Sequence, residues 1–297
     1  MTTQRAANKV PIEQQLLAVD QQFRDIRTWL AVDAEDVSAN SQGHLVNCEV
    51  RDAGSCEWLI DNSTFRDWIS PGEDKAYLWL RGPPGAGKSV ACSRAIEHVV
   101  EQGSIVLYHF LTFDKPSVSI RVIALLVDQL LSHYKKTDTS VAAPVFSYTD
   151  HSTRNFATIK EAARILLQSS QATLMTPEKQ RIFVFLDGLD EASRGEAANM
   201  IKFLINLKKE AEIDLRICIS CRNSIDLSMD VSKYSVIDVG EYMEKDVRAY
   251  LSREFPQLRI FGSNIERELE HHCQVLMSHL LTGISPTMGR ERSTTKV

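Results

Sequence analysis

Apolar side chains near the start of the chain recur at helical spacing. They stand at every third or fourth position between 12 and 30, which predicts one amphipathic helix; they are Ile12, Leu16, Val19, Phe23, Ile26 and Leu30. This helix could pack on the body of the chain or on a partner. Residues 31–50 are polar and contain Ser, Asn and Gly, so we expect a connector there. Residues 1–50 thus form a predicted helical arm and connector.

Short apolar runs alternate with longer helical patterns in the central part of the chain. The runs predict strands at Tyr77–Leu80, Ile105–Leu111, Ile182–Leu186, Leu215–Ser220 and Tyr234–Val239. Helical patterns lie between them at 88–101, 118–134, 157–170 and 196–210, after short helical pieces at 56–69. The run at 182–186 is apolar without alternation, as in a strand covered on both faces. We therefore predict an α/β domain at 51–240, in which helices cover both faces of a parallel sheet.

The last part of the chain predicts helices and then a polar tail. Helical patterns at Met243–Phe255 and Ile265–Leu281 place C-terminal helices within 241–282. Residues 283–297 contain few apolar side chains, and we expect a disordered tail. The longest apolar run, Val122–Val127, has six residues, far fewer than the ~20 that cross a bilayer. The polar start, Met1–Pro11, has no apolar segment typical of a signal peptide, so we expect a cytoplasmic protein.

Composition and charge narrow the possible partners. Hydrophobic residues make up 43% and charged residues 25% of the chain, as in ordinary globular proteins. The net charge of −5 gives no general attraction to nucleic acid. Six cysteines in a chain of 297 residues do not indicate a disulfide framework.

One glycine-rich segment fits the phosphate-binding pattern G-x-x-x-x-G-K-[ST]. It consists of Gly82, Pro83, Pro84, Gly85, Ala86, Gly87, Lys88 and Ser89. A predicted strand precedes it and a predicted helix follows, which is the context that this loop requires. Its glycines allow backbone N–H groups to turn toward phosphates, and the helix dipole adds to the anion site. Lys88 could then reach the β- and γ-phosphates of a nucleotide, and the Ser89 hydroxyl could bind Mg²⁺.

A second candidate group of residues follows the strand at 182–186. Asp187 stands where a P-loop enzyme holds Mg²⁺, although Asp-Gly is also a common turn pair. Asp190 and Glu191 are candidates to orient or deprotonate an attacking water. Either acid could instead cap the helix that follows or lie in its first turn.

The strand at 215–220 leads to Arg222. A cation at this strand end could sense a γ-phosphate and stabilise the transition state, but an arginine there is often a solvated surface residue. Cys218 and Cys221 have C-x-x-C spacing, yet on a strand they face opposite sides of the sheet. We predict that both cysteines pack in the core.

Together these residues resemble the NACHT group of STAND-class P-loop NTPases. The similarity is strongest to the nephrocystin-like N-terminal NTPase module of fungal receptor-like proteins, and it covers about residues 50–255. Four segments carry it: a lead-in at 55–68, the Walker A segment at 78–89, the Walker B segment at 185–191, and 220–222, where the family has its sensor-1 arginine.

The resemblance implies a fold and a way of working. It implies a five-stranded parallel sheet in the order 5-1-4-3-2, with the sensor-1 strand between the Walker A and Walker B strands. It also implies a switch that is closed with ADP and oligomeric with ATP and Mg²⁺. Family members continue into a winged helix and repeats. Residues 274–281 depart from the family pattern, so we expect an NTPase core that is truncated or acts with partners.

Several functions remain open from the sequence. The first is a signalling ATPase that hydrolyses slowly and forms homo-oligomers or binds other signalling proteins. The second is a nucleotide-binding interaction module without turnover. The third is a small P-loop kinase, which the absence of an arginine-rich lid disfavours. No N-K-x-D guanine motif is present, so ATP is the expected nucleotide.

Overall fold

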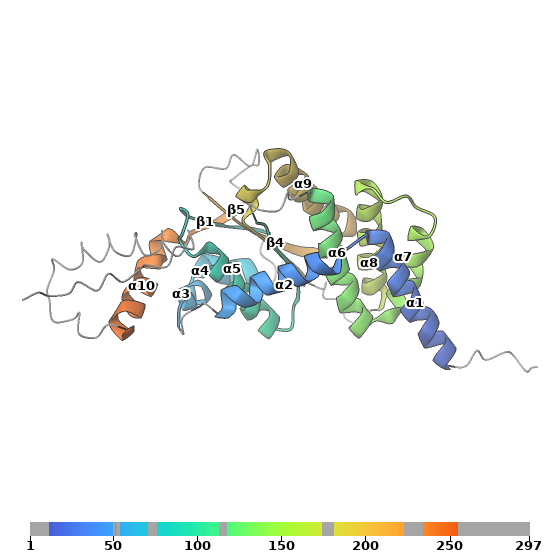
Figure 1. Cartoon of the computed structure of the whole chain (residues 1–297), viewed down its shortest axis with the longest axis horizontal. Coiled ribbons are helices and arrows are strands. Elements are labelled where there is room, and N and C mark those ends of the chain that lie inside the picture. Colours follow the sequence, from blue (N-terminus) through green and yellow to red (C-terminus); the bar gives the residue numbers. More distant parts are fainter. Residues whose placement is uncertain are drawn as a thin grey trace, which may run out of the picture.

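The computed structural model describes residues 12–49, 51, 54–70, 76–112, 118–173, 181–222 and 234–254 (Figure 1). The strands are β1 (Tyr77–Arg81), β2 (Ile105–Phe110), β3 (Arg181–Asp187), β4 (Asp214–Cys221) and β5 (Tyr234–Asp238). The helices are α1 (Ile12–Leu30), α2 (Ala34–Glu49), α3 (Glu57–Asp61), α4 (Ser63–Ile69), α5 (Lys88–Glu101), α6 (Ser119–Thr137), α7 (Ala142–Thr149), α8 (Phe156–Thr173), α9 (Arg194–Ala211) and α10 (Gly240–Glu254), with 3₁₀ turns η1 (Thr139–Val141) and η2 (Leu189–Glu191).

The five strands form one parallel sheet in the order β2-β3-β4-β1-β5, which reads 5-1-4-3-2 from the β5 edge. All five strands occur at the predicted places. In the sheet register Leu80 pairs with Ser220, and Leu186 pairs with Ile219. Strand β4 therefore lies between β1 and β3, and the carboxyl ends of all three strands meet at one edge of the sheet.

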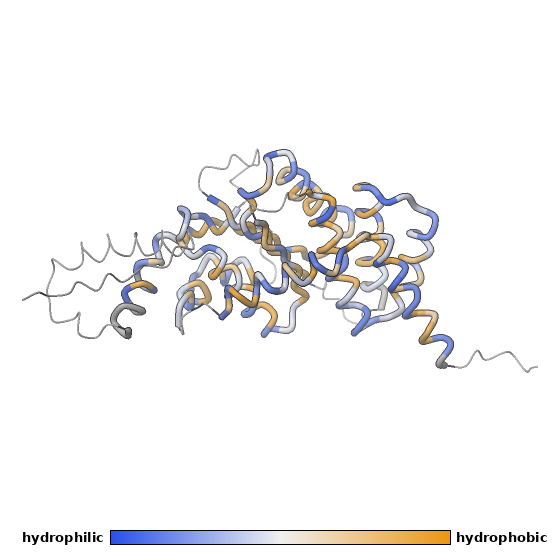
Figure 2. The backbone as a smooth tube through the Cα atoms, in the orientation of Figure 1, coloured by the Kyte–Doolittle hydropathy of each residue, from blue (hydrophilic) through white to orange (hydrophobic). Residues whose placement is uncertain are grey.

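Helices cover both faces of the sheet, which confirms the predicted three-layer α/β fold. Alternate side chains of β3 serve the two faces: Val184 packs in a core with α6, α8 and α9, while Phe183 packs in a core with α4 and α5. Trp68 of α4 is fully buried and meets the rings of Phe183 and Phe185 edge-on. Figure 2 shows the apolar residues concentrated along the strands at the centre of the molecule.

Helix α1 packs on the body of the chain, which resolves the alternative left open by its sequence. Phe23, Ile26 and Leu30 are buried against α6 and α7 (Figure 1). Arg27 donates through Nε and one terminal nitrogen to the two oxygens of Asp128 on α6, each at 2.7 Å. The Asp128 side chain is only 3% exposed, so this ion pair is shielded on its acidic side.

The predicted connector at 31–50 is wrong, because residues 34–49 form helix α2. Its apolar residues are too few to mark a continuous stripe, and polar contacts hold it instead. Asn40 donates to the carbonyl of Tyr108 at 2.9 Å and accepts from the amide of Phe110 at 3.0 Å. Gln129 of α6 donates to and accepts from Tyr108 at 2.8 and 2.9 Å. Two side-chain amides thus satisfy the outer backbone groups of β2.

Other elements agree with the sequence or lie beyond what is described. The helical patterns at 56–69, 88–101, 118–134, 157–170 and 196–210 are confirmed, and the helix expected from Met243 begins three residues earlier at Gly240. Helix α7 was not predicted. The expected helix at 265–281 and the expected tail at 283–297 lie outside the described residues. None of the described helices has the length and apolar character needed to cross a membrane.

Candidate functional site

The glycine-rich loop joins β1 to α5 and turns sharply at two of its glycines. Gly85 and Gly87 have φ values of 77° and 78°, a left-handed conformation that side chains disfavour. The amide of Ala86 donates to the carbonyl of Pro83 at 3.2 Å, which closes a turn inside the loop. Helix α5 begins at Lys88, so its positive end faces the loop. The predicted strand–loop–helix context is therefore present.

The Lys88 side chain folds back over the loop. Its ammonium donates to the carbonyls of Gly82 and Pro83 at 3.1 and 2.9 Å. This contact holds a positive charge at the mouth of the loop, where an anion would meet both the ammonium and the first amides of α5.

Asp187 lies at the end of β3, only 4% exposed, and faces the serines of two neighbouring elements. Ser220 of β4 donates a hydrogen bond to Asp187 Oδ1, and Ser89 of α5 also hydrogen-bonds the carboxylate. Burial raises the pKa of Asp187, while these hydrogen bonds and the charge of Lys88 oppose the rise. The structure thus brings together Ser89 and Asp187, the two residues predicted to bind Mg²⁺.

The turn after Asp187 is fixed by its glycine. Gly188 has φ 69°, and a Cβ added there would lie 3.0 Å from the carbonyl oxygen of Leu111. The Asp-Gly turn expected from the sequence is therefore present. The Asp187 side chain, however, bonds to the two serines and does not stabilise the turn. The amide of Glu191 returns to the carbonyl of Gly188 at 2.8 Å and closes η2.

Asp190 and Glu191 do not serve the following helix. The N-cap of α9 is Ser193, which accepts from the amide of Glu196, and Glu196 is the acid of the first turn. Both candidate acids instead face the cation at the end of β4. Arg222 Nε lies 2.7 Å from Asp190 Oδ2, and a terminal nitrogen of Arg222 lies 3.5 Å from Glu191 Oε1. Arg222 is therefore ion-paired, and its side chain is still 49% exposed.

The two cysteines of β4 pack as predicted. Cys218 and Cys221 are both fully buried, and they belong to the cores on opposite faces of the sheet. Burial raises the pKa of the Cys221 thiol to about 12, which makes it unreactive. No cluster of three or more metal-ligating His, Cys, Asp or Glu side chains occurs among the described residues.

The sequence did not identify one part of the site, the contact between the loop and α10. Arg81, at the end of β1, pairs with Asp238 at 3.2 Å, and Asp238 accepts from the amide of Gly240 at 3.1 Å. A Cβ at Gly240 would lie 3.3 Å from Pro83 Cδ. The start of α10 therefore packs directly against the loop, with little room for a side chain at position 240.

Polar contacts on the lead-in segment hold α10 from its other side. Asp246 accepts from the backbone amide of Cys56 at 2.9 Å and from the indole nitrogen of Trp58 at 3.1 Å. The rings of Trp58 and Tyr242 stack with their centroids 4.2 Å apart. Helix α10 is thus attached both to the loop and to the segment that precedes β1.

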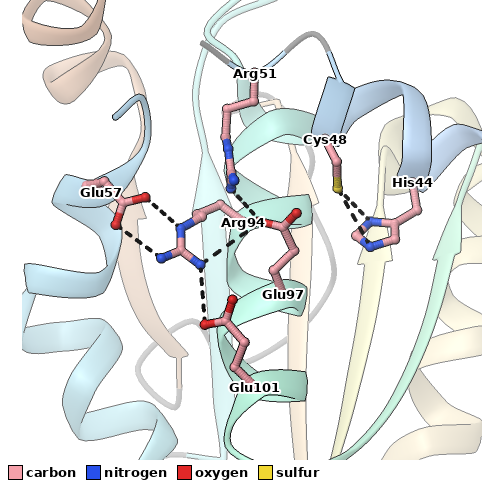
Figure 3. A network of polar contacts seen from close by, with 7 residues as sticks. All are labelled: His44, Cys48, Arg51, Glu57, Arg94, Glu97 and Glu101. Atoms are coloured by element: carbon pink, nitrogen blue, oxygen red, sulfur yellow. Dashed lines mark hydrogen bonds and ion pairs between the residues drawn. The ribbon is translucent and has the colours of Figure 1, made fainter. Parts of the chain in front are cut away.

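Helix α5 is fixed by charged contacts on the side away from the sheet (Figure 3). Arg94 donates to Glu57 of α3 at 2.8 and 3.1 Å and also lies near Glu97 and Glu101. Arg51 pairs with Glu97 at 2.6 Å. The bonds from Arg94 hold the pKa of Glu57 below its ordinary value. The helix that carries Lys88 and Ser89 is therefore connected to α3 and to the segment after α2.

Comparison with known proteins agrees with this architecture. A family model described as nephrocystin 3, N-terminal, matches residues 54–222, more than half of the 297-residue chain. The match begins at the lead-in before α3, contains the glycine-rich loop and the acidic end of β3, and ends at Arg222. Among curated proteins, none matches the chain. The chain therefore belongs to the nephrocystin 3 N-terminal family.

Proposed function

We propose that this chain binds ATP with Mg²⁺ at the glycine-rich loop, hydrolyses it slowly, and works as a nucleotide-dependent switch of the NACHT/STAND type. One observation carries the proposal: Ser89 and Asp187 meet beneath the loop that holds the Lys88 ammonium. A hydroxyl, a carboxylate and an ammonium at the positive end of a helix are the groups that a Mg²⁺–triphosphate needs.

Each group has a separate task in this proposal. Lys88 would leave the carbonyls of Gly82 and Pro83 and donate to phosphate oxygens, which carry more negative charge than carbonyls do. Ser89 and Asp187 would hold Mg²⁺, which neutralises charge on the phosphates. Because Asp187 is buried and its pKa is raised, a bound cation would also remove the cost of keeping that carboxylate charged.

Hydrolysis requires a group that positions or deprotonates water. Glu191 is our first candidate, because it lies in the turn directly after Asp187. Its contact with Arg222, at 3.5 Å, is also longer than the contact between Arg222 and Asp190. Asp190 is held more closely by Arg222, at 2.7 Å, and its side chain is only 10% exposed. We assign Asp190 to orientation of the arginine and Glu191 to the water.

The test is binding and single-turnover hydrolysis of Mg²⁺-ATP by the purified chain, with Lys88→Ala as the comparison. The proposal expects binding and slow turnover that both depend on Lys88. If the chain and the Lys88→Ala variant bind ATP equally, or if neither binds it, the loop is not a nucleotide site and the proposal fails.

A second function is favoured by one specific contact. Arg222 pairs with both candidate acids and would compete with a water for them. A chain that kept this arrangement with nucleotide bound would hold ATP without turnover and act as an interaction module. Lys88-dependent binding with no hydrolysis in the single-turnover experiment would select this function.

Assembly into oligomers or with other signalling proteins is part of the proposed switch. The observation that favours it is on α1, where Leu16 and Leu17 are 61% and 64% exposed while Phe23, Ile26 and Leu30 in the second half of the helix are buried on the body. We propose that this exposed end contributes to the assembled state.

A further inference from the structure

The Arg222 guanidinium presents one edge to two acids. Its Nε lies 2.7 Å from Asp190, and a terminal nitrogen of the side chain lies 3.5 Å from Glu191. The arginine side chain is 49% exposed, whereas that of Asp190 is 10% exposed. The acid is therefore fixed in the protein, and the cation is the partner that has room to move.

The position of Arg222 in the sheet places it next to the proposed phosphate site. It directly follows Cys221, which pairs in register with Arg81, the residue before the loop. The charge of Lys88 acts on both Cys221 and Asp187, and the charge of Asp190 also acts on Asp187. The lysine, the two aspartates and the end of β4 thus lie within electrostatic reach of one another.

The Nε edge of a guanidinium has one N–H on Nε and one on the neighbouring terminal nitrogen, so it can hold the two acids or one two-point acceptor, but not both at once. The edge formed by Nε and a terminal N–H is one that arginine uses for two-point binding of carboxylates and phosphates. The acids occupy this edge in the structure. A terminal phosphate that bound Arg222 through this edge would have to draw it away from Asp190 and Glu191, at the cost of leaving a largely buried carboxylate without its cation.

From this geometry we propose that Asp190, assisted by Glu191, competes with the terminal phosphate of the nucleotide for Arg222. The competition lowers the preference of the chain for triphosphate over diphosphate, and Asp190 is the residue that sets this preference. The same exchange connects nucleotide state to the acids, since they lose their cation only when a triphosphate is bound. This inference rests on the proposed nucleotide site.

The experiment measures binding, so it does not depend on turnover. Dissociation constants are determined by calorimetry for Mg²⁺-ADP and for the Mg²⁺ complex of a non-hydrolysable β,γ-imido triphosphate. The variants are Asp190→Asn, Arg222→Gln and the double variant, and circular dichroism confirms that each is folded. Glu191→Gln provides a second route in case Asp190→Asn does not fold.

We expect Asp190→Asn to increase the triphosphate-to-diphosphate affinity ratio by about tenfold, a size typical of coupling between contacting groups. Glu191→Gln should shift the ratio in the same direction but less, because its contact is longer. In the Arg222→Gln background the effect of Asp190→Asn should disappear, because there is no cation left to release.

Three results would overturn the inference. An unchanged ratio in Asp190→Asn would show that the acid does not restrain the arginine. An equal increase with and without Arg222 would show a simple effect of removing negative charge near phosphate. Failure of the unmodified chain to bind either nucleotide would remove the nucleotide site itself, and with it this inference; that result is distinct from normal binding with an unchanged ratio.

Discussion

The Ser220 hydroxyl donates a hydrogen bond to the buried carboxylate of Asp187, across the pairing of β4 with β3. Asp187 keeps a pKa above its ordinary value because burial outweighs this bond and the one from Ser89. The fold therefore retains a group that is unfavourable in its charged form, which is typical of functional sites.

Asp187→Asn should stabilise the chain in the absence of nucleotide and Mg²⁺. A group whose pKa is raised on folding contributes stability below its unfolded pKa and loses it as pH rises through the folded pKa. At pH 7 the neutral amide avoids that loss, so the melting temperature should rise by a few degrees. The gain should shrink as pH falls from 7 through the folded pKa of Asp187, because the unmodified side chain then becomes protonated. Thermal melts across this pH range would contradict the assignment if the variant melted lower throughout.

Lys88→Ala should weaken Mg²⁺-ATP binding by about 100-fold, because it removes the charge that meets the phosphates. Its melting temperature should change little, since among the described residues the Lys88 ammonium donates to loop carbonyls alone. The matched control is Lys202→Ala on the exposed side of α9, which should bind ATP normally. Calorimetry on the unmodified chain and the two variants measures ATP affinity. An equal loss of affinity in both variants would indicate a general effect of removing positive charge.

Glu191→Gln should bind ATP but hydrolyse it about 100-fold more slowly, a typical effect of losing a general base. The amide keeps the shape of the side chain and its place in η2, so folding should be unaffected. Single-turnover assays at saturating ATP measure the effect. A slow Asp190→Asn with a normal Glu191→Gln would move the water-activating role to Asp190.

Arg27→Ala should lower the free energy of unfolding by about 2 kcal/mol, between the effects seen for exposed and buried ion pairs. The reason is that Asp128 would stay buried on α6 without its cation. Arg24→Ala is the matched control, because the Arg24 guanidinium bonds to the nearby Gln21 on the exposed face of α1 rather than to a buried acid. Urea unfolding measures the stability of both variants. Equal stabilities of Arg27→Ala and Arg24→Ala would mean that α1 is held by its apolar residues alone.

Replacing Leu16 and Leu17 together by Ser should leave the melting temperature unchanged, because both side chains are exposed. If the exposed end of α1 takes part in assembly, the variant should form fewer oligomers with nucleotide than the unmodified chain does. Size-exclusion chromatography with light scattering compares the two. Unchanged oligomer size, in the presence of assembly, would remove α1 from the interface.

The strands of the sheet could be predicted because a short local sequence pattern marks each of them. Continuous apolar runs such as 182–186 mark buried parallel strands, and the loop motif fixes the start of α5 at Lys88. Helix α2 escaped prediction because Asn40 and other polar contacts hold it, so no apolar stripe marks it. The role of Arg222 was equally hidden, since its partner Asp190 lies 32 residues earlier and meets it only through the pairing of β3 with β4.

At the β2 edge of the sheet, the side-chain amides of Asn40 and Gln129 hydrogen-bond backbone groups with which another strand could otherwise pair. A cover of this kind can be removed without breaking any other strand pairing. A chain shortened to begin after α2 would lose the bonds of Asn40 and leave the Phe110 amide open to an extended segment of another molecule, while Gln129 would keep its bonds to Tyr108. Strands that offer open backbone tend to pair between molecules. Helix α2 therefore covers part of the β2 edge, and we expect its removal to favour pairing of that edge with a neighbouring molecule, whatever the nucleotide state.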